Sequence, residues 1–159
     1  MYEQYGFWTV DGLTDFGHMP GGIIPGIDSS VPIRLQHGNN AFGAAHIELR
    51  HRTWLQKNGH SAASMVHFKL QQSGKIFSTE SYDKTKVSMT ISPSALLVLQ
   101  YVPKFRFLTV VTVFAKTGPL DGELLGNYKA PPGPPHYLRP VSLYAPPQPQ
   151  PRRPQKKFG

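Results

Sequence analysis

Histidine is the side chain best suited to proton transfer near neutral pH, and five of the seven histidines lie between residues 37 and 67. Arg50 follows His46 by four residues, a spacing that places both side chains on one face of a helix. An imidazole supplies an acid or a base, and a guanidinium holds a phosphate and stabilises developing charge. The pair therefore predicts phosphodiester cleavage without a metal. A basic helix face that is simply solvated is the alternative.

Other side chains extend this hypothesis. Lys57 continues the cationic stripe of the same helix, while Lys69 and Lys86 give weaker signals. Thr109 and Thr112 lie in one predicted strand, and strict alternation puts them on opposite faces. A threonine hydroxyl that faces the helix would donate to a phosphate oxygen, although threonine in a strand is first of all a β-former.

Metal chemistry is not predicted. A zinc-binding helix carries histidines at i and i+4, whereas His46 and His51 are five residues apart and point about 140° away from each other in an ideal helix. The chain has no cysteine, and its nine acidic residues do not cluster, which argues against thiolate zinc sites and two-metal nuclease centres. A site completed in space by His37 or His67 stays open as the alternative. We expect no metal and no cofactor.

Composition indicates one domain and a basic tail. The 159 residues carry 17 Lys+Arg against 9 Asp+Glu, a formal net charge of +8 that favours polyanionic partners. Residues 131–159 hold ten of the sixteen prolines and no acidic residue, which is typical of an extended polyproline segment. We find no apolar run long enough for a membrane span and no secretory signal at the N-terminus.

Hydrophobic periodicity predicts one helix followed by strands. Residues 31–36 alternate as a short strand, and residues 41–58 have helical spacing that ends at Gly59. Period-two patterns follow, with short connections, at residues 65–71, 75–80, 86–91, 95–102 and 106–115. We interpret Phe105, Phe107 and Phe114 as sheet core; they would form a stacking platform only if they faced outward.

These elements predict an α+β fold in which a helical segment packs on an antiparallel meander of about four to five strands. An extended proline-rich C-terminal tail follows this unit. The corresponding boundaries are an irregular N-terminal segment at residues 1–29, a nuclease-like domain at 30–117, and a linker with the basic tail at 118–159.

Three motifs resemble the barnase, EndoU, colicin and RelE-like superfamily of metal-independent ribonucleases, in the branch found in phage proteins and bacterial polymorphic toxins. A strand of the type I-x-L-x-x-G matches Ile33 to Gly38, and a helix with G-x-x-H-I-x-x-x-H matches Gly43 to His51. A closing V-T-x-F/Y strand matches Val111 to Phe114. The likeness covers about residues 30–116.

The resemblance implies RNA cleavage by attack of the ribose 2′-hydroxyl on its own phosphate, with tRNA a frequent target. It implies that His46 is the general acid/base, that His51 is the second histidine of the helix motif, and that Thr112 is the hydroxyl of the last strand. With Arg50 these are the expected catalytic residues. The expected substrate-binding residues are Arg34, Lys57, Lys69, Lys86 and Thr109.

We therefore expect an endoribonuclease toxin that acts in the cytoplasm of a target cell and is delivered there as part of a secreted bacterial toxin. A cognate immunity protein or antitoxin is expected to neutralise it. The alternative is a non-catalytic phage or assembly protein whose basic, proline-rich tail binds a partner or RNA.

Overall fold

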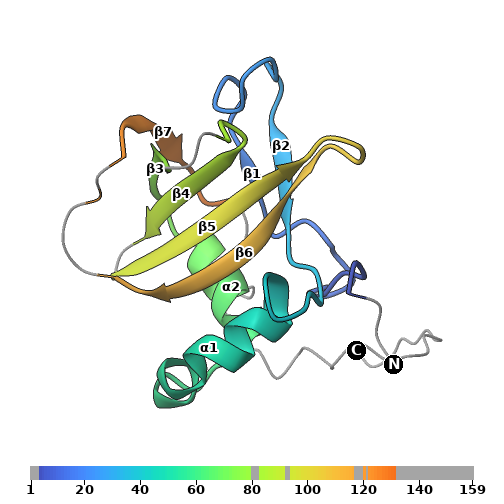
Figure 1. Cartoon of the computed structure of the whole chain (residues 1–159), viewed down its shortest axis with the longest axis vertical. Coiled ribbons are helices and arrows are strands. Elements are labelled where there is room, and N and C mark those ends of the chain that lie inside the picture. Colours follow the sequence, from blue (N-terminus) through green and yellow to red (C-terminus); the bar gives the residue numbers. More distant parts are fainter. Residues whose placement is uncertain (1–3, 80–82, 92–93, 117–119, 121, 132–159) are drawn as a thin grey trace.

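A computed structural model describes residues 4–79, 83–91, 94–116, 120 and 122–131 of the chain (Figure 1). It contains one mixed seven-stranded sheet in the order β1-β2-β6-β5-β4-β3-β7 and two helices. The elements are β1 (Gly17–Met19), β2 (Val31–Arg34), α1 (Gly43–Lys57), α2 (Ala62–Leu70), β3 (Gly74–Ser78), β4 (Lys86–Ile91), β5 (Ala95–Val102), β6 (Phe107–Ala115) and β7 (Leu124–Tyr128).

The sheet curves so far that its two edge strands, β1 and β7, approach each other, and it forms a nearly closed, barrel-like sheet. A Cβ atom added to Gly17 in β1 would overlap the hydroxyl of Tyr128 in β7, which shows how closely the edges approach. The same hydroxyl donates a buried hydrogen bond of 2.6 Å to the carbonyl oxygen of Leu70 at the end of α2. The pairing of β2 with β6 is parallel, and the other pairings are antiparallel.

The predicted fold class is therefore wrong. The chain forms a seven-stranded, barrel-like sheet with two helices instead of a helix packed on a meander of four to five strands. The strands at 86–91 and 95–102 are confirmed with the same bounds. Strands β1 and β7 were not expected, and β7 extends the sheet beyond the boundary that composition predicts at residue 117. The proline-rich tail, residues 132–159, lies outside the described residues.

The segment predicted as a strand at residues 65–71 lies almost entirely in α2. Ser61 caps the start of the helix: its hydroxyl accepts from the Ser64 amide at 3.1 Å, while the Ser64 hydroxyl accepts from the Ser61 amide at 2.8 Å. These reciprocal bonds satisfy amides that have no partner within the helix. The Glu48 carboxylate of α1 accepts from the Ala62 amide at 2.6 Å. Eight of the nine residues of α2 are buried, so its sequence shows no polar face with helical spacing, and the alternation within residues 65–71 was misinterpreted as a strand.

A single core lies between α2 and the inner face of the sheet. Strand β5 supplies one side of it, since its odd-numbered residues are buried in the core cluster while Val98, Gln100 and Val102 face outward, half-buried. Helix α1 contributes Ala44, Ile47 and Leu55 to the same cluster. In the part of the chain that the structure describes, neither helix has the length and apolar character needed to cross a membrane.

Candidate functional site

Two histidines of α1 lie close together, and an arginine directly precedes the second of them. The helix has a non-helical residue at His51, with φ −129° and ψ 27°. The imidazoles of His46 and His51 lie with ring centroids 6.3 Å apart and planes at 83°. The expectation that they point about 140° apart is therefore wrong, because it assumed an unbroken helix. The Arg50 guanidinium acts electrostatically on His51 as well.

The two imidazoles have different environments. His46 is half-buried, and its Nδ1 lies 2.8 Å from the carbonyl oxygen of Asn40. A carbonyl accepts only, so Nδ1 carries a proton and Nε2 remains for proton transfer. His51 stacks on Phe114 of β6 with centroids 5.3 Å apart and planes at 23°. Burial, and then the charges of His46 and Arg50, lower the pKa of His51, which favours its neutral, basic form.

A β-bulge in β6 brings the two candidate threonines onto one face. Val98 pairs with Thr112 and Leu99 pairs with Val110, so Val111 is an extra residue in β6. Alternation is reset there, and Thr109 and Thr112 both lie on the outer face of the sheet together with Phe107 and Phe114. The prediction that they lie on opposite faces is wrong for this reason. Their relative exposures are 5% and 8%.

Both threonine hydroxyls are buried without a hydrogen-bond partner among the described residues. An unpaired buried hydroxyl costs about 1–3 kcal/mol, and native structures contain few of them. Two such groups on one face of one strand are therefore unusual, and a bound ligand oxygen is one way to satisfy them.

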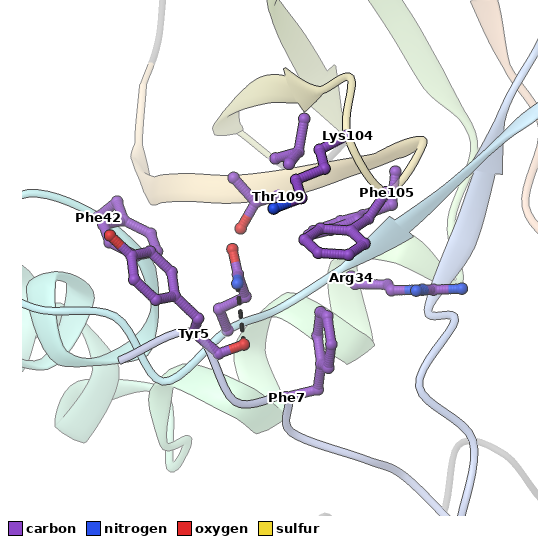
Figure 2. Close-up of a pocket in the computed structure, with 10 residues that line it drawn as sticks. Tyr5, Phe7, Arg34, Phe42, Lys104, Phe105 and Thr109 are labelled. Atoms are coloured by element: carbon purple, nitrogen blue, oxygen red, sulfur yellow. Dashed lines mark hydrogen bonds between the residues drawn. The ribbon is translucent and has the colours of Figure 1, made fainter. Parts of the chain in front are cut away.

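A cavity of about 760 Å³ opens on the outer face, next to Thr109. Five aromatic residues line it: Tyr5, Phe7, Phe42, Phe105 and Phe107. The remaining lining residues are Arg34, Gln36, Val102, Lys104 and Thr109. Figure 2 shows Tyr5 and Phe42 on one side, Phe7 and Phe105 on the other, and Thr109 between them. We call this cavity the aromatic pocket; the helix histidines are not among its described lining residues.

Arg34 forms part of one wall of the aromatic pocket. Its Nε donates to the Asp15 carboxylate at 2.6 Å, and its guanidinium carbon lies 5.5 Å from the Phe7 ring centroid and 5.4 Å from that of Phe107. These contacts fix the side chain while its terminal nitrogens stay available as donors. Arg34 is adjacent to Thr109 in the parallel pairing of β2 with β6.

The sheet brings three of the predicted substrate-binding residues into one row. Lys86 of β4 pairs with Gln100, Gln100 pairs with Thr109, and Thr109 pairs with Arg34. Because neighbouring strands lie about 4.8 Å apart, Lys86 and Thr109 are about 10 Å apart along this row. Gln100 also belongs to the row, although no pattern in the sequence pointed to it.

The other two predicted binding residues lie elsewhere. Lys57 is exposed in the last turn of α1, beyond the kink. Lys69 is 5% exposed in α2, with its ammonium 5.7 Å from the Phe68 ring centroid, and burial lowers its pKa. Neither lines the aromatic pocket.

The aromatic pocket itself was missed. Phe105 and Phe107 were interpreted as sheet core, yet both line the pocket on the outer face. Tyr5, Phe7 and Phe42 carry no motif; they reach the site because residues near Phe7 pair with the segment after β2, where the amide of Trp8 donates to the Leu35 carbonyl at 2.9 Å.

Within the described residues, no three His, Cys, Asp or Glu side chains lie together in a way that could hold a metal ion. No protein-family model, curated protein or solved structure matches the chain.

Proposed function

We propose that the protein is an endoribonuclease that cleaves RNA through the two imidazoles of α1. The observation that carries the proposal is the His46–His51 pair, with centroids 6.3 Å apart beside a guanidinium. Transfer of a phosphoryl group within RNA needs one base, one acid and a cation at the phosphate. The helix edge offers these three groups together.

The proposed step assigns His51 as the base and His46 as the acid. Neutral His51 removes the proton of the ribose 2′-hydroxyl, and the 2′-oxygen forms a bond to phosphorus. The bond between phosphorus and the 5′-oxygen of the next nucleotide breaks, and protonated His46 gives its proton to that oxygen. The products are a 2′,3′-cyclic phosphate and a 5′-hydroxyl. Arg50 stabilises the charge on the phosphate oxygens.

Purified protein incubated with total RNA in excess chelator provides the test. Discrete fragments with cyclic-phosphate ends are expected, and His46→Ala should reduce the rate about 10²- to 10⁴-fold. His18→Ala is the matched control, because His18 is an exposed histidine in β1. The acidic limb of the pH–rate profile should lie below 6.5, since the pKa of His51 is lowered from that value. Full activity of His46→Ala, or loss of cleavage in chelator, would contradict the proposal.

The cellular setting follows from the resemblance stated above. We propose that the enzyme acts on RNA, with tRNA as the first candidate, in the cytoplasm of a target cell, and that a cognate immunity protein or antitoxin restrains it. Expression of the chain in the bacterial cytoplasm should arrest growth, and His46→Ala should relieve the arrest. Growth at the normal rate with soluble wild-type protein would contradict this part.

A further inference from the structure

We infer that the aromatic pocket binds one nucleobase of the RNA, in a nucleotide next to the one that is cleaved. This inference rests on the proposed function, because it names how the same enzyme holds its substrate. The pocket lies on the same sheet face as Thr112 and Phe114. At about 3.3 Å per residue, Thr109 and Phe114 are about 15 Å apart along β6, so a base in the pocket belongs to a neighbouring nucleotide.

The shape and chemistry of the walls fit a flat aromatic ring. Tyr5 and Phe42 stack with centroids 6.1 Å apart, and Phe7 meets Phe107 edge to face at 5.3 Å. Tyr5 and Phe105 are 61% and 65% exposed and line the same pocket, and exposed apolar side chains gathered in one place mark a binding surface. Bases stack on such rings irrespective of sequence. The volume of about 760 Å³ lies within the range of about 300–1,000 Å³ that small-molecule sites occupy.

The charges around the pocket fit a ligand that joins a ring to a phosphate. Arg34 and Lys104 line it, with the Lys104 ammonium 5.4 Å from the Phe105 ring centroid, and no acidic residue is among its described lining residues. Asp15 engages Nε of Arg34 and leaves the terminal nitrogens for a phosphate oxygen. A purely apolar ligand would use neither the terminal nitrogens of Arg34 nor the ammonium of Lys104.

The floor of the pocket fits the polar edge of a base. The unpartnered Thr109 hydroxyl is part of it, as is Gln36, which is 5% exposed and donates through Nε2 to the Tyr5 carbonyl at 3.0 Å. Figure 2 shows Lys104 beside Thr109. Lys104 is exposed and long enough to swing aside, which gives a base access to the hydroxyl. The apolar side chain of a partner protein would leave this hydroxyl unsatisfied.

Titration of the wild-type protein with the four nucleoside 5′-monophosphates, followed by calorimetry and NMR, tests the inference. Ribose 5-phosphate, which lacks the base, should bind at least tenfold more weakly. Phe105→Ala should weaken nucleotide binding about 5- to 150-fold, the range expected for one lost stacking ring. Thr109→Val should reduce, by about tenfold, the ratio between the affinities of the tightest and the weakest of the four nucleotides. Phe68→Ala and Thr90→Val, which remove a ring and a hydroxyl away from the pocket, should bind as the wild type does.

Equal binding of ribose 5-phosphate and nucleotides, or an unchanged affinity in Phe105→Ala, would overturn the inference. Binding of an aromatic peptide but of no nucleotide would overturn it as well, in favour of a protein partner. The outcome is separable from that of the proposed function. If the protein binds nucleotides through Phe105 but does not cleave RNA, only the proposed ribonuclease activity is contradicted. If it cleaves RNA but does not bind nucleotides, only the proposed role of the aromatic pocket is contradicted.

Discussion

The contact between Gly17 and Tyr128 joins the two edges of the sheet, and a double-mutant cycle measures it. In Tyr128→Phe the buried Leu70 carbonyl loses its 2.6 Å donor, which should cost about 1–2 kcal/mol of unfolding free energy. In Gly17→Ala the new Cβ would overlap the Tyr128 hydroxyl. Tyr128 is 1% exposed and cannot swing into solvent, so this change should cost about 1–3 kcal/mol, as overpacked cores do.

The double mutant should cost less than the sum of the two single mutants. Once the hydroxyl is gone, the nearest ring atom to the new Cβ is Cζ, at 3.2 Å, a separation that a small shift relieves. We therefore expect a coupling free energy of about 1–2 kcal/mol in favour of the double mutant. Urea unfolding monitored by circular dichroism supplies the four free energies, provided that the m-value stays constant.

A matched cycle of Gly17→Ala with Tyr101→Phe provides the control. Tyr101 lies in β5, three strands away from β1 in the sheet, and its cycle should be additive within about 0.5 kcal/mol. Additive behaviour of the Gly17–Tyr128 cycle as well would refute the close approach of β1 and β7, and with it the near closure of the barrel.

Two further predictions concern the outer face and the histidines. Thr112→Val should leave the fold intact and raise the unfolding free energy by about 1 kcal/mol, because it removes an unpaired buried hydroxyl; a destabilised variant in urea unfolding would indicate a hydrogen bond to Thr112. Acidification should destabilise the protein, because burial lowers the pKa of His37, His51, His60 and His67 in the folded state. As the pH falls below about 6.5, the unfolded chain binds more protons than the folded protein does. The free energy of unfolding is therefore highest above this pH and decreases as the pH falls toward the lowered pKa values of the folded state. His67→Gln should flatten this dependence, and a melting temperature that rises between pH 7 and pH 5 would contradict the reasoning.

Local pattern predicted the elements that have one buried face. Strand β4 alternates clearly because one of its faces packs on the core, whereas β5 is a short, almost wholly apolar run between turn residues. Gly59 marks the end of α1, where its positive φ of 71° suits a residue without a side chain. Helix α2 was missed because it is buried on nearly all sides. Its best local signal is the Ser61 and Ser64 pair, which caps the helix at a spacing of three residues.

The sequence predicted which residues belong to the candidate site, but not how their side chains are arranged. His46, Arg50 and His51 were selected by type and spacing, yet the kink that brings the imidazoles together is a tertiary effect, since His51 packs against Phe114 of a distant strand. The Val111 bulge depends on register with β5 and leaves no mark in the sequence of β6. The aromatic pocket combines residues from position 5 to position 109, so no local window contains it.

The parallel pairing of β2 with β6 joins Ile33 to Leu108, and this has a consequence for biosynthesis. While the ribosome makes the chain, β2 has no partner on that side until most of the sheet has emerged, and the β4–β5–β6 meander forms first because its contacts are local. Tyr5 and Phe7 must then pack against Phe107 and Thr109, about 100 residues later in the chain. We therefore expect the aromatic pocket to form only after β6 has left the exit tunnel, late in the synthesis of the sheet.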